Sequence, residues 1–505
     1  MKNATVLIKN SIYLVSKLIF TLIVSLYCSR VILQELGVID YGIYNVVGGI
    51  VTMLTFVTGS MAQATQRFFS YDLGAGSRSI SRVYSTSINI YIVLIFIVLI
   101  LSQTVGLWTL KNVVVIPDER IDSAYWVYQI SVLTFISAII SLPFNSLMLA
   151  YERMKVYSIF GILSIIVKLL MVLSLGFFEY DKIIVYAFFI FVLNVFITIM
   201  PILYKFLKIS DVKYERVFDK ELSRRMLSYS GWNLFGAMSA VGINQGGSLL
   251  LNSFFGPTVN ASRAIAMQVN AAVVGFTSNI NTAINPQIIK RYSSQNFNSM
   301  KSLILNGARY STLLMIAIGI PIFFYAEQLI YMWLGNVPDH TIVFTRLVVI
   351  DSIICSLSGT LITTIQATGR IRKYQIVVGG ILLFNIPISY WLLLNFSNPS
   401  IPLYVMIVLS ILAMNARLSF VREIINLTFI EFYYKVILRV SFVLLMSSLS
   451  IYFLVYSTNV AFVIAFPLSF LLASFSSLIF GLKLKEIKFL IDFIPFISKD
   501  KKQKY

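Results

Sequence analysis

Histidine, cysteine and charge are all scarce in this chain of 505 residues, and each scarcity excludes a class of function. His340 is the only histidine, which excludes zinc sites built on histidine pairs and acid–base triads built on histidine. The two cysteines, Cys28 and Cys355, lie in apolar runs and indicate neither a disulfide framework nor a metal cluster. The sequence also lacks a phosphate-binding glycine loop, a carboxylate pair within an apolar segment and a nucleophile–base set. We therefore expect no enzyme activity and no cofactor.

Charged residues make up only 12% of the chain, whereas apolar residues make up 58%, which is about 290 of the 505. Soluble domains carry about twice that share of charge. A helix that spans a bilayer needs about 20 predominantly apolar residues, so this composition suffices for about 14 spans. The apolar runs place these spans at 11–33, 41–65, 84–110, 123–150, 156–178, 180–204, 229–254, 262–288, 304–326, 341–367, 374–396, 401–425, 436–457 and 459–482. The sequence therefore predicts an all-α polytopic membrane protein.

The basic residues are distributed unevenly among the predicted loops. Lysine and arginine number 40 against 21 acidic residues, which gives a formal net charge of +19. In a soluble chain this balance would favour a nucleic-acid partner, but in a membrane protein it is the positive-inside signal. With the N-terminus in the cytoplasm, the inside segments hold about 32 of the 40 basic residues and the outside loops about six. We therefore expect both termini in the cytoplasm and no nucleic-acid partner.

The longest break between spans, from Lys205 to Leu227, divides the chain into two halves. Basic and apolar residues alternate in it, which suits either an amphipathic helix on the cytoplasmic leaflet or a solvated linker. The segments that close the first and seventh spans, 33–40 and 251–257, are similar at an offset of about 219 residues, as in an internal repeat. The predicted domains are an N-lobe of spans 1–6 (1–205), a cytoplasmic amphipathic linker (206–228), a C-lobe of spans 7–12 (229–425), spans 13 and 14 (426–482) and a basic cytoplasmic tail (483–505).

Two neighbouring predicted spans carry stripes of polar residues, which are costly inside a membrane and mark a pathway or a helix contact. The eighth span has five at steps of seven, seven, four and four, which place them on one helical face: Arg263, Asn270, Thr277, Asn281 and Asn285. The seventh span has four at steps of eleven, four and four: Asn233, Asn244, Ser248 and Asn252. The stripes predict the walls of a water-filled cavity. The alternative is hydrogen bonding between helices, for which Gly242 and Gly246 allow close packing.

Charged residues occur at a few positions inside or near the ends of the spans. Lys168 and Asp351 lie near the middle of the fifth and tenth spans, too deep to reach the interface. Either they form a structural ion pair across the lobes, or Lys168 lines an anion-binding lumen while Asp351 takes up protons or a cation. Lys17 either reaches the cytoplasmic face or faces the lumen. Arg30 and Arg263 lie near the outer interface, one in each lobe, as interfacial anchors or as a ring that gathers phosphate.

Three stretches in the middle of the chain, Ser230–Ala237, Leu250–Ala266 and Asn281–Ile288, resemble a known family, as does the opening Glu35–Tyr44. The family is that of the O-antigen and capsule flippases of bacteria. These form the polysaccharide-transporter branch of the multidrug/oligosaccharidyl-lipid/polysaccharide exporter superfamily. The strong local match covers about 225–295, and the layout of spans fits the family over essentially the whole chain.

The resemblance implies two six-helix lobes around a central cavity, with two C-terminal helices added. It implies a carrier in the bacterial inner membrane that moves undecaprenyl-pyrophosphate-linked oligosaccharide repeat units from the cytoplasmic to the periplasmic leaflet. Transport would proceed by alternating access, coupled to a gradient of H⁺ or Na⁺, with membrane lipid and a polysaccharide polymerase as further partners. Lys17 and Arg263 best match the basic residues that the family has on spans 1 and 8.

The candidate site residues combine these observations. The substrate-binding candidates are Lys17, Arg30, Lys168, Asn233, Asn244, Arg263, Asn270 and Asn281, and the candidate for ion coupling is Asp351. The alternatives are a multidrug cation antiporter or a lipid II flippase of the same superfamily and, from another class, an O-antigen polymerase or ligase. An antiporter for cations should have several carboxylates in its spans, and a polymerase should have a long outside loop.

Overall fold

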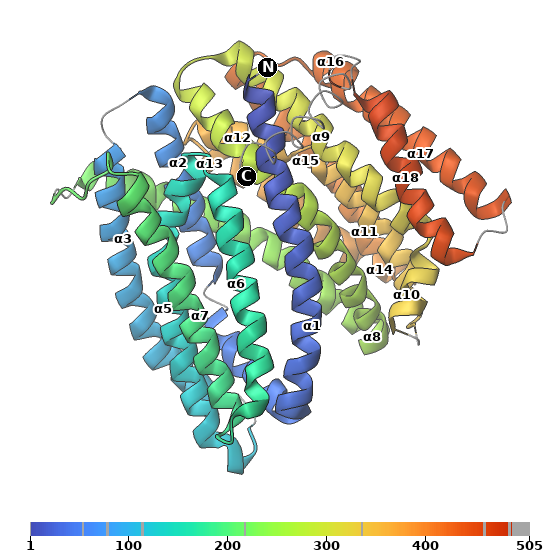
Figure 1. Ribbon diagram of the computed structural model, residues 1–505. Coiled ribbons are helices and arrows are strands. Elements are labelled where there is room, and N and C mark those ends of the chain that lie inside the picture. Colours follow the sequence, from blue (N-terminus) through green and yellow to red (C-terminus); the bar gives the residue numbers. More distant parts are fainter. Residues whose placement is uncertain are drawn as a thin grey trace, which may run out of the picture. The chain divides into compact units, whose positions relative to one another are not determined.

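The computed structural model describes residues 2–52, 55–76, 80–112, 116–216, 219–334, 337–457, 461–482 and Glu486. Within these residues the chain is helical, joined by short turns and extended links, and has no strand (Figure 1). The helices are α1 (Lys2–Thr52), α2 (Thr55–Ala75), α3 (Ile80–Leu101), α4 (Leu107–Asn112), α5 (Ile121–Ala150), α6 (Met154–Ser174), α7 (Lys182–Lys208), α8 (Lys220–Ser293), α9 (Phe297–Phe324), α10 (Ala326–Leu334), α11 (Thr341–Ser356), α12 (Gly359–Ala367), α13 (Arg372–Leu383), α14 (Asn385–Asn395), α15 (Ile401–Ile425), α16 (Phe429–Phe432), α17 (Leu438–Ser457) and α18 (Phe462–Gly481). Single helical turns lie at η1 (Ser102–Gly106), η2 (Asp118–Arg120), η3 (Leu175–Phe177) and η4 (Tyr433–Ile437).

Ten helical segments of the described chain are long and apolar enough to cross a bilayer, and the bent pair α11–α12 makes an eleventh. The prediction of an all-α polytopic membrane protein is thus confirmed. The described residues of each predicted span are largely helical, in several cases across a break between two helices, but three spans are not among the eleven. The ranges 41–65 and 262–288 are interrupted by Gly, Ser, Thr, Asn and Gln. The range 11–33 contributes only a shorter apolar stretch, Ser16–Ser25.

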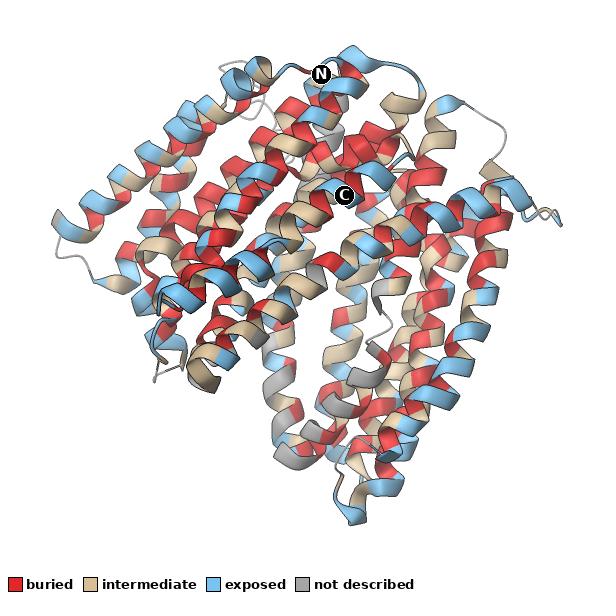
Figure 2. Cartoon of the chain, turned by 180° about the vertical axis from the view of Figure 1, so that it is seen from behind, coloured by how far each residue is buried: buried red, intermediate tan, exposed pale blue. Residues whose placement is uncertain are grey.

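Buried and exposed residues alternate along many helices, as the red and pale-blue ribbon of Figure 2 shows, and many of the exposed residues are large and apolar. Phe96 on α3 is 62% exposed and Leu471 on α18 is 67% exposed. Soluble proteins rarely expose apolar surface continuously along whole helices. Such faces are suited to lipid, and together with the spans they make this a multi-pass membrane protein.

The chain divides into two compact units. Unit 1 contains Met1–Ala237 and Asn285–Asn296, and unit 2 contains Met238–Ile284 and Phe297–Tyr505. In unit 1, α5 packs against α7 and α2, and α1 packs against α6. In unit 2, α9 packs against α11, α17 and α18, and α15 packs against α11 and α13. The two ends of α8 thus belong to unit 1 and its middle belongs to unit 2. The lobe boundaries given by the sequence stay a prediction.

The link between α7 and α8 is non-helical in residues 209–216, with a turn at 210–211. Hydrogen bonds hold it to α3, where the N–H of Glu215 donates to Ser85 Oγ at 2.7 Å. The next helix, α8, begins at Lys220, and Asp219 caps it through a carboxylate oxygen that accepts from the backbone. Of the two alternatives for this segment, the described residues contain no separate amphipathic helix: 206–208 end α7, 209–216 are non-helical, and 220–228 are the first turns of α8.

Two glycines break the longest helices in the same way. Gly37 in α1 has φ 74° and ψ 171°, and Gly256 in α8 has φ 79° and ψ −177°. This backbone region is essentially restricted to glycine, because a Cβ atom strains it. The two positions lie 219 residues apart (256 − 37 = 219), which is the offset of the predicted repeat. The equivalent breaks agree with an internal duplication.

Substituting either glycine by alanine should destabilise the protein by about 1–3 kcal/mol, because the side chain strains this backbone. An added Cβ at Gly37 or Gly256 meets no atom within 4 Å, so the cost comes from the backbone alone. Thermal unfolding of the purified protein in detergent measures the change. The matched control is Gly59→Ala, which also meets no atom within 4 Å but lies on ordinary helical backbone. Equal melting temperatures for all three variants would contradict the assignment of strain.

Candidate functional site

Among the described residues of unit 2, Asp351 is the buried acid, and it lies on α11, a few residues before this helix ends. Ser410 Oγ on α15 donates to its Oδ1 at 2.6 Å, and Cys355 Sγ donates to its Oδ2 at 3.6 Å. Arg417, also on α15 and buried, lies close enough to act electrostatically on the carboxylate. An isolated charge in an apolar interior is very costly, so these partners are what makes a carboxylate tolerable there.

The helix that carries Asp351 is broken. The axes of α11 and α12 differ by 41° across Leu357 and Ser358. Arg417 Nη1 donates to Ser358 Oγ at 3.2 Å, which connects the break to the surroundings of the acid. Broken membrane helices free backbone carbonyls that can coordinate a coupling ion. A carboxylate, hydroxyls and freed carbonyls together have the chemistry to hold a proton or a hard monovalent cation.

The polar stripe of the eighth predicted span meets the surroundings of this acid. Ser352, which follows Asp351 in the chain, donates a hydrogen bond to Asn270 Oδ1. Asn281 Oδ1 accepts from Ser311 Oγ on α9 at 3.3 Å. Both asparagines therefore form hydrogen bonds to neighbouring helices, which is the alternative to a cavity wall given by the sequence. The water-filled cavity stays a prediction.

Arg263 is 6% exposed and lies in the half of α8 that follows the Gly256 break. Its Nη1 donates to Ser248 Oγ at 2.7 Å, on the half that precedes the break. Its guanidinium also fills the space beside Gly247, where a Cβ atom would lie 3.0 Å from Nη2. The arginine thus bridges the two halves of α8 within unit 2.

The two candidate lysines of unit 1 lie along the packing between α1 and α6. Lys17, on α1, is half-buried, and its Nζ lies 4.2 Å from the centre of the Tyr157 ring. Its aliphatic end packs against Gly161. Lys168 is half-buried on α6 and lies close enough to Cys28 of α1 to act on it electrostatically. Within the described residues of unit 1, no acid forms an ion pair with either lysine.

The other candidates are scattered. Asn233 is buried in the part of α8 that belongs to unit 1, and Asn244 is exposed in unit 2. The backbone of Arg30 is part of α1, but its side chain lies outside what the structure describes. Lys168 and Asp351 belong to different units, so their ion pair stays a prediction.

Arg67 is a buried charged residue that is not among the candidates from the sequence. It is buried in unit 1, with its guanidinium over the rings of Phe68, Tyr71 and Tyr229 at 4.7, 4.9 and 5.7 Å. Arginine stacks well on aromatic faces, so this aromatic cage stabilises a buried charge. The i,i+4 spacing of Arg67 and Tyr71 is a local sequence signal for their contact. The contact with Tyr229 has no such signal, because the two residues are far apart in the sequence.

Glu152 is a second residue that sequence reasoning missed. It has a positive φ of 57°, which is uncommon outside glycine and asparagine. Its carboxylate accepts from Gln287 Nε2 at 2.9 Å and from Lys290 Nζ at 2.8 Å. Glu152 therefore holds the last turns of α8 to the turn between α5 and α6 in unit 1.

The contact between Lys17 and Gly161 gives a probe of the lysine that spares the fold. In Gly161→Ala the new Cβ would lie 2.1 Å from Lys17 Cε, so the flexible end of the lysine must move away. Alanine is also the better helix former, by about 0.5–1 kcal/mol, so we expect no loss of stability. If Lys17 binds an anionic substrate, the initial rate of transport should fall about tenfold or more. A hydrogen bond to a charged group contributes about 1.5–3 kcal/mol, and each 1.4 kcal/mol corresponds to about a factor of ten. Unchanged transport in Gly161→Ala and in Lys17→Ala would remove Lys17 from the site.

Comparison with known proteins finds similarity in structure alone. No family model matches the sequence, and no curated protein matches it. A multidrug resistance MATE family transporter of the MOP superfamily, in an outward-facing conformation, has a TM-score of 0.71 at 11% identity, over 83% of this chain and 96% of that chain. The MATE transporter VcmN of Vibrio cholerae, in its bent form, has a TM-score of 0.70 at 14% identity, over 86% of this chain and 100% of that chain.

A third solved structure is a MOP superfamily transporter from Pyrococcus furiosus, for which the reverse polarity of the binding pocket suggests a different function. Its TM-score is 0.70 at 10% identity, over 83% of this chain and 96% of that chain. At such identities the likeness shows the fold alone. The chain thus has the fold of the MATE transporters, about 12 helices in two lobes, which confirms the predicted fold class.

Proposed function

We propose that the protein is a flippase for undecaprenyl-pyrophosphate-linked oligosaccharide repeat units of an O-antigen or capsule. It moves them from the cytoplasmic to the periplasmic leaflet of the bacterial inner membrane by alternating access. One observation carries the choice of an anionic substrate: among the described residues, buried basic side chains outnumber buried acidic ones by five to two. The basic ones are Arg67, Lys205, Arg263, Arg309 and Arg417, and the acidic ones are Asp40 and Asp351.

The physical need for these cations follows from the substrate. A diphosphate cannot enter hydrocarbon, because removing a charge from water without compensation costs many kcal/mol. Guanidinium and ammonium groups replace the lost hydration, and guanidinium matches phosphate with paired N–H donors. We assign the diphosphate to Lys17, Lys168 and Arg263, with Arg30 gathering it at the outer face. The amides assigned to the sugar hydroxyls are Asn233, Asn244, Asn270 and Asn281.

We further propose that Asp351 couples transport of the lipid-linked oligosaccharide to an ion gradient. Its carboxylate takes up H⁺ or Na⁺ from the side of higher electrochemical potential and releases it on the other side. Because α11 is broken beside it and Ser352 bonds to Asn270, a change in the charge of Asp351 acts directly on the packing of α8 against α11. The coupling ion thus biases the conformation of a helix that carries substrate-binding candidates.

The second candidate function is a multidrug cation antiporter. It is favoured by the fold shared with a multidrug resistance transporter and by the buried carboxylate of Asp351. A cation carrier holds its substrate with carboxylates, whereas most buried charge in the described chain is positive. The two proposals therefore make opposite predictions about the sign of the substrate.

A deletion strain of the host bacterium separates the two proposals. We expect loss of surface polysaccharide and accumulation of lipid-linked repeat units on the cytoplasmic leaflet, before they reach a polymerase. Plasmid-borne wild-type protein should restore the polysaccharide. Normal polysaccharide in the deletion strain, together with cationic-dye resistance on overexpression, would show the antiporter. Chain lengthening of the lipid-linked units by the purified protein would instead show a polymerase.

A further inference from the structure

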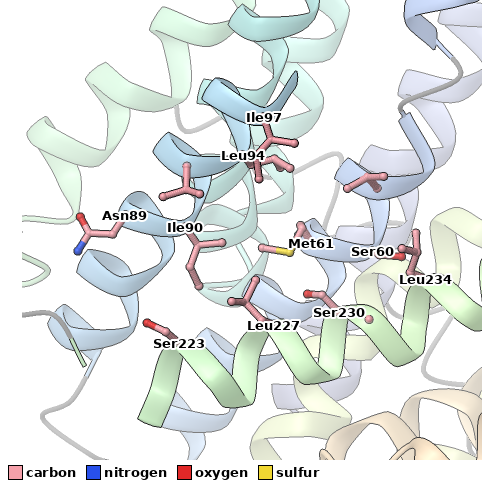
Figure 3. A pocket seen from close by; sticks show the side chains of 13 residues that line it. Ser60, Met61, Asn89, Ile90, Leu94, Ile97, Ser223, Leu227, Ser230 and Leu234 are labelled. Carbon is pink, nitrogen blue, oxygen red and sulfur yellow. The ribbon is translucent and has the colours of Figure 1, made fainter. Parts of the chain in front are cut away.

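Unit 1 contains an apolar groove between α2, α3 and the first turns of α8 (Figure 3). Its volume is about 320 Å³. The apolar side chains that line it include Met61, Ile90, Leu94, Ile97, Leu227 and Leu234. Ile97 and Leu227 are 48% and 51% exposed, so the groove opens sideways, onto a surface that lipid covers in a membrane.

Two buried hydroxyl groups of α8 face this apolar space. Ser223 and Ser230 both line the groove, and each is at most 6% exposed. Neither Oγ has a hydrogen-bond partner within the part of the chain that the structure describes. A buried hydroxyl without a partner is costly, so the two point to an occupant with hydrogen-bond acceptors. A hydrocarbon chain alone has none, whereas a phosphate and an ester carbonyl do.

The end of the groove nearest Ser223 is basic. Lys220 lies one turn earlier on the same face of α8, and Arg82 lies on the same face of α3 as Asn89, two turns before it. Both basic side chains are exposed. The hydroxyl of Tyr214 donates to Asn89 Oδ1 at 2.9 Å, which holds the link between α7 and α8 beside this end.

The chain from the last turn of α7 to the first turns of α8 is positive even when its acids are included. Residues 205–227 hold seven basic and four acidic side chains, a net charge of +3 (7 − 4), and this excess lies on the two helix ends, since the link itself, 209–219, holds two basic and three acidic side chains. Asp219 is used as the cap of α8, and Glu221 is paired with Arg225 at 2.7 Å. An anionic headgroup therefore finds complementary charge where the groove begins.

We propose that the groove binds an anionic glycerophospholipid. The phosphate lies by Lys220 and Ser223, an ester carbonyl accepts from Ser230, and one acyl chain follows Leu234 and Ile97. The spacing fits, because Ser223 and Ser230 are separated by a rise of about 10 Å, which a phosphoglycerol unit with its ester bridges. The site uses none of the residues assigned to the transported substrate, so it stands independently of the proposed function.

Gly231 makes a selective test possible. It lines the groove, and a Cβ added to it meets no atom within 4 Å, so Gly231→Leu fills the space without a collision at the backbone. The matched control is Gly380→Leu on α13 in unit 2, where an added Cβ also meets no atom within 4 Å. Thermal unfolding at the wild-type temperature establishes that both variants are folded.

The full-length protein is reconstituted into phosphatidylcholine vesicles that contain a trace of phosphatidylglycerol with a photoactivatable diazirine in its acyl chain. Cross-links are mapped by mass spectrometry. We expect them to concentrate on the peptides of α2, α3 and α8 that line the groove, to disappear there in Gly231→Leu and to persist in Gly380→Leu. A phosphatidylcholine probe should label the groove less, and Lys220→Gln should reduce the preference for phosphatidylglycerol about fivefold, as expected for one charge near a membrane surface.

Either of two results overturns the site. One is labelling spread evenly over all lipid-facing helices, which would mean that the groove holds only bulk lipid. The other is groove labelling that persists in folded Gly231→Leu. Equal labelling by the two probes in the wild type overturns the assignment of an anionic headgroup.

Discussion

Replacing Asp351 by asparagine should leave the protein folded and disconnect its transport from the ion gradient. Asparagine has the shape of aspartate but stays neutral, so it can neither release a proton nor hold a cation by charge. Its amide oxygen can still accept the hydrogen bond from Ser410, which is 2.6 Å in the wild type. The loss of stability should therefore be about 1 kcal/mol, the usual value of one weakened hydrogen bond.

Proteoliposomes with an imposed pH or Na⁺ gradient measure the effect. For the wild type, the initial rate of transport should rise when the gradient is applied. For Asp351→Asn, the rate with the gradient should equal the rate without it. An Asp351→Asn variant that still responds to the gradient would show that the coupling ion binds elsewhere.

Asp40 provides a matched control for this substitution. It is buried to nearly the same extent as Asp351, 7% against 8% exposed, but it lies in unit 1. Its Oδ2 pairs with Arg120 at 2.9 Å, so it has a structural partner of opposite charge. Asp40→Asn should lower stability and keep the response to the gradient. Loss of the response in both variants would mean that any buried acid is needed, and would remove the specific role of Asp351.

The parts of the fold that the sequence predicts are those decided locally. Hydropathy over about 20 residues is enough to place a membrane helix. The described residues of each predicted range are therefore largely helical. The repeat was found for the same reason, since Gly37 and Gly256 each close a similar local segment. In the structure, both glycines adopt the same positive-φ conformation.

What the sequence could not predict depends on contacts between distant residues. Ser410, which donates to Asp351, lies 59 residues away, and Tyr229 of the aromatic cage lies 162 residues from Arg67 (229 − 67 = 162). The sequence leaves the segment around 209–216 open between an amphipathic helix and a linker, because its bonds to serines of α3 produce no local pattern. The break between α11 and α12 did have a local signal, since Ser–Gly pairs mark helix kinks, and Ser358–Gly359 lies there.

Arg263→Ala and Lys168→Ala should each abolish surface polysaccharide while leaving the protein at its normal level. Arg263 is buried, yet within the described residues only one of its five N–H groups donates a hydrogen bond to the protein, to Ser248. The other donors are therefore available to an anion. Lys168 has no acidic partner among the described residues of unit 1. Each lost contact to a diphosphate should lower transport by about 10- to 100-fold, since a hydrogen bond to a charged group contributes about 1.5–3 kcal/mol.

Three companion variants distinguish substrate binding from a structural role. Arg263→Lys keeps the charge and should retain part of the activity, whereas Ser248→Ala removes only the partner and should be active. Arg346→Ala is the matched control in unit 2, because Arg346 Nε donates to the carbonyl of Phe323 at 3.1 Å, and it should produce normal polysaccharide. If Ser248→Ala fails as completely as Arg263→Ala, the arginine acts by bridging the halves of α8. If Arg263→Ala and Lys168→Ala both produce normal polysaccharide, neither binds the diphosphate, and a cationic substrate becomes the better assignment.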